Sequence, residues 1–153
     1  MEPLANEATP GLRLPERGRR VRLITIFYGI LVFFWFSPED DSILTVTILG
    51  TGLALLLVVR SVLSKFGGKR IPIHWVVPGI GLSGALIGLG GSVLTALLML
   101  LKNARHSHLF PDYPPEVMLA TLERAPVWAL AGALAGLGLG LAWLALRQAD
   151  QPE

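Results

Sequence analysis

Cysteine is absent from this chain, and charged residues make up only 16% of its 153 residues. The absence of cysteine excludes disulfides, thiolate nucleophiles, CxxC redox pairs and cysteine-ligated metals. The scarcity of charge excludes an ordinary soluble domain, which has about 25% charged residues, because the chain lacks the side chains needed to cover its own surface. Hydrophobic residues make up 52% of the sequence, which excludes a disordered chain. An integral membrane protein remains.

Four apolar stretches without Asp, Glu, Lys or Arg follow one another, at residues 23–36, 43–59, 71–101 and 126–146. They predict an all-α integral membrane protein, a bundle of four transmembrane helices with one short interfacial helix in the third loop. We place the spans at about 21–36, 42–60, 78–101 and 126–146. The first span fits an uncleaved signal anchor better than a cleaved signal peptide, because residues 36–39 form no small-residue cleavage site.

Capping residues predict where the second helix begins and ends. Ser37 suits the N-cap and Pro38 the first helical position, with Glu39 and Asp40 in the positive first turn. The Gly67-Gly68 pair is typical of a helix stop.

Prolines divide the third apolar stretch and the loop that follows it. Pro78 predicts the start of the third helix, with residues 71–77 extended or interfacial; a re-entrant segment over 71–81 is the alternative. In the loop, residues 115–124 predict an amphipathic helix on the membrane surface, with Met118, Leu119 and Leu122 on its apolar side.

The distribution of Lys and Arg predicts the orientation. Ten of these residues collect on the side of both termini and three on the other side. We therefore expect a disordered basic cytoplasmic arm over 1–20, a cytoplasmic tail over 147–153 and a bacterial-type inner membrane. Because the arm borders the membrane, its partners are expected to be anionic lipid headgroups and not nucleic acid.

The uncharged spans argue against an ion-coupled transporter, because such proteins need ionisable groups at membrane depth. A pore made by several copies stays open as an alternative, since hydroxyl side chains could line it. The simpler interpretation is that these hydroxyls bond helix carbonyls. They are Thr45, Thr47, Thr51, Ser83, Ser92 and Thr95.

Small residues recur every four positions in the last two spans. The stripe in the third span comprises Gly84, Gly88, Ser92 and Ala96, and that in the fourth comprises Gly132, Gly136 and Gly140. Residues at this spacing share one helix face and let another backbone approach closely. The partner is either the other stripe of the same chain or a helix of another subunit.

The densest cluster of polar groups comprises Lys102, Arg105, His106, His108 and Asp112. The two histidines and Asp112 would hold a metal or another ligand if the chain is extended there, because residues two apart on a helix point to opposite sides. The alternative is that the third helix continues through Lys102, Arg105 and His106, where cations favour the helix C-terminus.

The residues around Pro111 form the remaining candidate surface. Phe110, Pro111 and Tyr113 suit a stiff type I turn, and together with Lys102 and Arg105 they form a possible docking loop. Ser107 beside two histidines makes no catalytic triad, because adjacent residues cannot reach each other in the required order.

These patterns predict a structural, assembly or partner-binding component of a membrane complex that acts through glycine-rich helix faces, and they favour a protein that is not an enzyme. Its expected partners are the bilayer and other membrane-protein subunits or further copies of itself. A metal- or ligand-binding protein using His106, His108 and Asp112 and an oligomeric channel or passive transporter are the alternatives. No cofactor is implied.

Overall fold

The computed structural model describes residues 11–16, 18–38, 41–105 and 111–149. Its elements, in chain order, are β1 (Gly11–Arg13), α1 (Arg19–Trp35), α2 (Ile43–Phe66), β2 (Arg70–Pro72), α3 (Ile73–Arg105), α4 (Pro115–Glu123) and α5 (Ala125–Ala149). The described chain is therefore almost entirely helical, as the sequence predicts.

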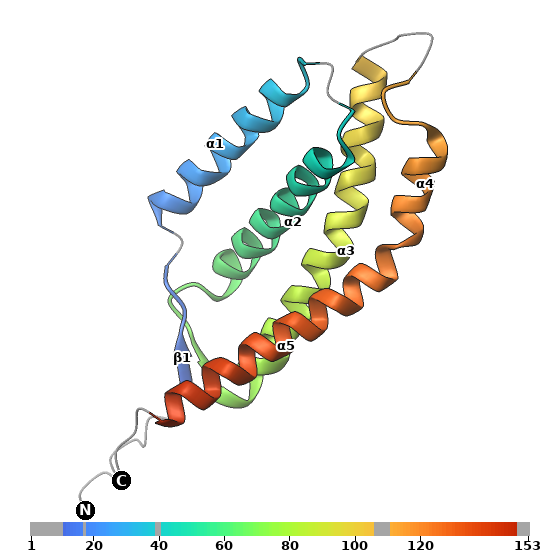
Figure 1. The fold of residues 1–153 in the computed structure, drawn as a ribbon. Coiled ribbons are helices and arrows are strands. Elements are labelled where there is room, and N and C mark those ends of the chain that lie inside the picture. The colour runs from blue at the N-terminus through green and yellow to red at the C-terminus, as the bar shows by residue number, and fades with distance from the viewer. Residues whose placement is uncertain (1–10, 17, 39–40, 106–110, 150–153) are drawn as a thin grey trace, which may run out of the picture.

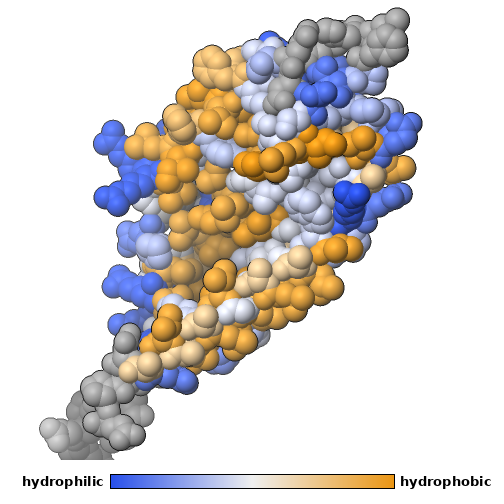
Figure 2. All heavy atoms as spheres, viewed as in Figure 1, coloured by the Kyte–Doolittle hydropathy of each residue, from blue (hydrophilic) through white to orange (hydrophobic). Residues whose placement is uncertain are grey.

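Three of these helices, α2, α3 and α5, are long and apolar enough to cross a membrane, which indicates a membrane-associated protein. With 17 residues, α1 measures roughly 26 Å at 1.5 Å per residue, less than a hydrocarbon core of about 30 Å. Among the described residues, length and composition thus support three spans where the sequence predicts four. Figure 2 shows a hydrophobic surface over the middle of the molecule with hydrophilic atoms at opposite edges.

The long helix α3 is the centre of the fold (Figure 1). The helix α5 packs along one side of α3, α2 packs on another side, and α4 lies beside its C-terminal part. The helix α1 contacts α2 and lies outermost. A buried cluster near the C-terminal end of α3 joins α1, α2, α3 and the segment before α4; it consists of Trp35, Val46, Leu49, Leu98, Met99 and Tyr113.

The helix α2 begins later than its capping pattern predicts. Its N-cap is Ser42, whose Oγ accepts a hydrogen bond from the Thr45 N–H at 3.3 Å. Ser37 belongs to the turn that ends α1, because its N–H donates to the Phe34 carbonyl at 3.1 Å. The prediction of Ser37 as the N-cap is wrong, because the chain from Ser37 still belongs to the turn that ends α1 and a second serine, Ser42, caps α2. The predicted stop is confirmed, with Gly67 as C-cap and Gly68 at a φ of +77°.

Pro78 lies inside α3 and does not begin it, which corrects the predicted start. Residues 71 and 72 are extended in β2, as predicted, but the helix starts at Ile73 and runs without a break through residue 81, so residues 73–77 are helical and not extended. A proline near the start of a helix removes one backbone hydrogen bond, here to the His74 carbonyl. The single lost bond is offset by the packing of this first part of α3 against α5.

Part of the N-terminal arm is ordered, which corrects the expectation of disorder over 1–20. The strand β1 pairs antiparallel with β2, and Leu12 lies opposite Ile71. Two further bonds extend the pairing, from Leu14 N–H to the Lys69 carbonyl at 3.2 Å and from Gly68 N–H to the Leu14 carbonyl at 3.1 Å. The amino-acid composition of the arm cannot predict this pairing, because backbone groups form its hydrogen bonds and the two strands lie far apart in the sequence.

Candidate functional site

The two predicted small-residue stripes meet each other inside the chain. A side-chain Cβ built at Gly84 or at Gly132 would collide with the carbonyl oxygen of the other residue. A Cβ at Gly136 would lie 2.5 Å from the Ile80 carbonyl oxygen, and one at Gly140 would lie 3.2 Å from the Val77 Cα. The backbones of α3 and α5 are therefore in direct contact, and the stripe contact lies within one chain.

A second face of α3 contacts α2 in the same manner. A Cβ at Gly91 would lie 3.1 Å from the Thr51 Oγ1, and a Cβ at Gly90 would lie 3.2 Å from the Ala54 Cβ. On the α2 side, a Cβ at Gly50 would lie 2.6 Å from the Thr95 backbone nitrogen. Small residues thus allow close approach of α3 to both of its long neighbours.

Two of the predicted hydroxyl side chains bond helix carbonyls, and two others are buried between helices. Ser83 Oγ donates to the Gly79 carbonyl at 2.8 Å within α3, and Ser92 Oγ donates to the Thr121 carbonyl of α4 at 2.5 Å. Thr51 and Thr95 lie in the α2–α3 contact, where their Oγ1 atoms are buried and make no hydrogen bond.

The predicted polar constellation is only partly described. The helix α3 continues through Lys102 to Arg105, as the helix-extension interpretation predicts. His106, His108 and Phe110 lie outside the described residues. Within the described part of the chain, no three His, Cys, Asp or Glu side chains are grouped so that they could hold a metal ion. The metal site therefore remains a hypothesis.

Two residues of the predicted docking loop are buried, which removes them from any exposed surface. Lys102 is fully buried at the end of α3, with its Nζ 4.3 Å from the centre of the Trp35 ring. Tyr113 is 1% exposed and is held by the Asn103 side chain, which donates to the Tyr113 carbonyl at 2.7 Å and accepts from the Tyr113 N–H at 3.0 Å. We call Trp35, Lys102, Asn103 and Tyr113 the polar clamp, because they join α1, α3 and the segment before α4.

Other members of that loop are placed differently. Arg105 and Pro111 are exposed, and Asp112 is partly buried. Asp112 does not cap the following helix, because the N-cap of α4 is Pro114 and its first residue is Pro115. The sequence does not predict the polar clamp, because Trp35 and Lys102 are distant in the chain and only the fold brings them together.

The side of α5 that faces away from α3 carries a second series of small residues. A Cβ at Gly138 would meet nothing within 4 Å, so the surface there is open. The members are all exposed and recur at alternating spacings of four and three residues, so they share one helix face. We call them the outer face of α5: Ala131, Ala135, Gly138, Ala142 and Ala145.

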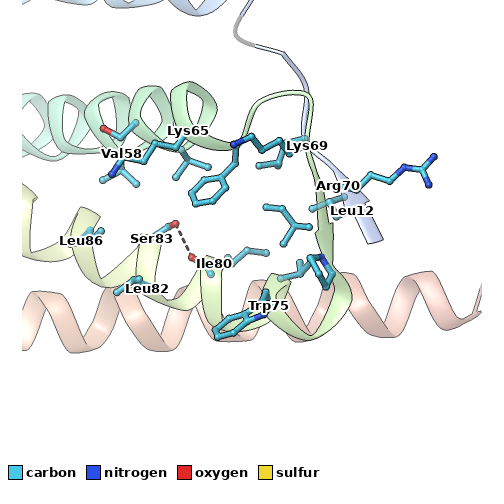
Figure 3. Close-up of a pocket in the computed structure, with 18 of the residues that line it drawn as sticks. Leu12, Val58, Lys65, Lys69, Arg70, Trp75, Ile80, Leu82, Ser83 and Leu86 are labelled. Carbon is cyan, nitrogen blue, oxygen red and sulfur yellow. Dashed lines mark hydrogen bonds between the residues drawn. The ribbon is translucent and has the colours of Figure 1, made fainter. Parts of the chain in front are cut away.

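An open groove of about 840 Å³ lies between the C-terminal half of α2 and the N-terminal part of α3 (Figure 3). Leu12 of β1 and Ile71 of β2 line one end of it. The rim carries three exposed cations, Lys65, Lys69 and Arg70. We call this cavity the basic groove. In the sequence, its cations indicate only the orientation of the chain in a membrane.

The outer face of α5 and the basic groove are the two described surfaces with a form suited to binding. The close packing around α3 holds in place the helices that carry these two surfaces. Searches of the protein-family models, of curated protein sequences and of solved structures find no match to this chain.

Proposed function

We propose that the protein is a structural, partner-binding component of a membrane complex, and that the outer face of α5 contacts a transmembrane helix of the partner. The observation that carries this proposal is the exposed row of small side chains opposite the side of α5 that packs on α3. The glycine stripes of the sequence prediction are occupied within the chain, so the partner-binding role passes to this second face.

Packing in lipid explains why such a face favours a helix over acyl chains. Apolar burial does not drive helix association there, because lipid tails are as apolar as leucine. Close van der Waals contact does, and small residues allow it. The alternating spacing keeps the row straight along α5, as in the seam of two packed helices. Leu134 and Leu141 flank the row and are exposed, so they provide contacts on one side of an approaching helix.

The proposal includes four spans, with α1 as the fourth. Most of the apolar side chains of α1 are exposed, including Leu23, Phe27 and Ile30, as expected of a helix surrounded by lipid. Arg22 extends the usable length of α1, because a long cationic side chain can reach the headgroups while its stem stays in the apolar layer. The helix α4 lies beside the C-terminal part of α3, and the exposure of its Leu119 and Leu122 supports contact with lipid near the membrane surface.

In the proposed orientation, the end of the molecule with β1 and β2 is cytoplasmic, in a bacterial-type inner membrane. The excess of Lys and Arg on that side supports this orientation. A cysteine-free chain makes the test direct. Glu16→Cys lies near the end with β1 and β2, Arg105→Cys lies at the opposite end of α3, and both positions are exposed. We expect a membrane-impermeant maleimide to label Arg105→Cys in spheroplasts and Glu16→Cys only after lysis; the reverse result contradicts the orientation.

A photo-reactive residue on the outer face of α5 tests the proposed contact. We expect position 138 to give a discrete protein adduct in native membranes, either with a second copy or with another membrane protein. Position 29 on α1 is a matched control, because a Cβ at Gly29 also meets nothing within 4 Å. The adduct should disappear in an Ala135→Leu/Ala142→Leu variant of unchanged thermal stability. Adducts with lipid alone at position 138 would overturn the proposal.

A further inference from the structure

The basic groove exists because the close contact between α2 and α3 ends part of the way along both helices. The helices approach each other closely where small residues face each other, as at the pair Ala54 and Gly90. Beyond this pair α2 carries larger side chains, among them Val58 and Val62, which line the groove. The open space continues to Gly79 of α3, where a Cβ would meet nothing within 4 Å.

The wall of the groove is apolar and its rim is cationic. Apolar residues of both helices and of the β1–β2 segment form most of the wall, which also includes Ser61 and Ser83, and Trp75 lies exposed at its edge. The side chains of Lys65 and Lys69 lie along the rim, whereas that of Arg70 extends away from the cavity (Figure 3). Among the described residues that line the groove there is no Asp or Glu. The cavity therefore combines an apolar interior with a positive field at one end.

Size and position narrow the class of ligand. The volume of about 840 Å³ falls in the range of roughly 300–1,000 Å³ that is typical of small-molecule sites. Lys65 lies in the last turn of an apolar helix of spanning length and Lys69 follows that helix, so both lie where headgroups are expected to meet the hydrocarbon layer. A molecule that fills the whole groove must be apolar along its length and negative at one end.

We propose that the basic groove binds one anionic phospholipid, with its phosphate at Lys65 and Lys69 and an acyl chain along Val58, Val62 and Ile80. The strands β1 and β2 close the end of the site beside the headgroup, so the lipid enters from the side of the membrane. Arg70 adds long-range positive charge without direct contact. This site is independent of the proposed partner contact, because no residue of α5 lines the groove.

The test is native mass spectrometry of the full-length protein from detergent micelles that contain equal amounts of phosphatidylglycerol and phosphatidylcholine with identical acyl chains. We expect the protein to retain one phosphatidylglycerol in preference. In a Lys65→Gln/Lys69→Gln variant the preference should fall roughly thirtyfold, because each interfacial lysine contributes about a factor of five towards anionic lipid. A matched Arg105→Gln/Arg124→Gln variant removes the same charge outside the groove and should keep the preference.

Two further arms separate the lipid from other ligands. Gly79→Leu places a side chain in the open groove and should release the bound phosphatidylglycerol without lowering thermal stability. Inorganic phosphate should not displace the lipid, since phosphate leaves the apolar wall unfilled. Equal retention of both lipids by the native chain, loss of preference in both double variants, or displacement by phosphate each overturns the proposal.

Discussion

The Lys102 ammonium lies 4.3 Å from the centre of the Trp35 ring and joins the end of α1 to the end of α3. Lys102 is fully buried and Trp35 is 8% exposed, so the contact is shielded from water. A cation over an indole face contributes up to about 2 kcal/mol when it is desolvated. Lys102, a member of the predicted docking loop, therefore lies inside the protein and holds together α1 and α3, two helices that are distant in sequence.

Replacing Trp35 tests this contact. We expect Trp35→Ala to lower the free energy of unfolding by about 3–5 kcal/mol, because a large buried ring is lost together with its attraction for Lys102. Trp35→Phe keeps an aromatic face and should retain a substantial part of that stability. Reversible unfolding in mixed micelles, followed by circular dichroism, measures both changes. Equal losses in the two variants would show that the aromatic face contributes nothing beyond volume.

The Asn103 side chain provides a second test, at the loop before α4. Asn103→Ala removes the bonds of 2.7 and 3.0 Å to the Tyr113 backbone and should destabilise the fold by about 1–3 kcal/mol, since it leaves buried polar groups without a partner. Asn103→Asp keeps the acceptor for the Tyr113 N–H and loses only the donor. Hydrogen exchange at the Tyr113 amide should therefore accelerate strongly in the alanine variant and less in the aspartate variant. Unchanged exchange in both variants contradicts the prediction.

Two glycine substitutions compare a position inside the contact between α3 and α5 with a position on the open outer face of α5. Gly84→Ala forces a Cβ against the Gly132 carbonyl, and overpacking of this kind lowers stability by about 1–3 kcal/mol. Gly138→Ala places its Cβ in open space and should leave stability unchanged or raise it by up to about 1 kcal/mol, because alanine favours the helix. Thermal unfolding in detergent distinguishes the two. If both variants are equally stable, the close contact of α3 with α5 is not present in the membrane.

The turn between α2 and β2 depends on one backbone conformation. Gly68 has a φ of +77°, and a side chain in that region is disfavoured by about 1–2 kcal/mol. Gly68→Ala should therefore weaken the β1–β2 pairing, whereas Gly67→Ala should not, because Gly67 has a φ of −55°. Hydrogen exchange at the Leu14 amide, which donates to the Lys69 carbonyl, reports the difference. Similar exchange in the two variants would contradict the role assigned to Gly68.

Local sequence signals predicted the features that depend on neighbouring residues alone. The apolar runs predicted the regions that form α2, α3 and α5, and the glycine pair after Phe66 predicted the end of α2. The basic residues at the end of α3 were consistent with a helix that continues to Arg105. Composition and periodicity are sufficient here, because hydrogen bonds within a helix and transfer into lipid involve no distant part of the chain.

Local signals did not predict the outcome where the chain offers two possibilities. Ser37 has the stronger local capping pattern, with a proline and two acidic residues after it, and yet the fold uses Ser42. Pro78 is compatible with a helix start and with the interior of an early helical turn, and packing against α5 selects the interior. The choice in each case depends on contacts with other helices, which the local pattern does not contain.

The amino-acid sequence by itself determined that this chain contains apolar stretches that form helices long enough to cross a membrane, because the free energy of burying each stretch depends on its own residues. The tertiary structure alone decided which faces are used. It joined the glycine stripes of α3 and α5, buried Lys102 against Trp35, and opened a groove where the small residues of α2 end. Those outcomes depend on the distance between backbones, and only the assembled helices set that distance.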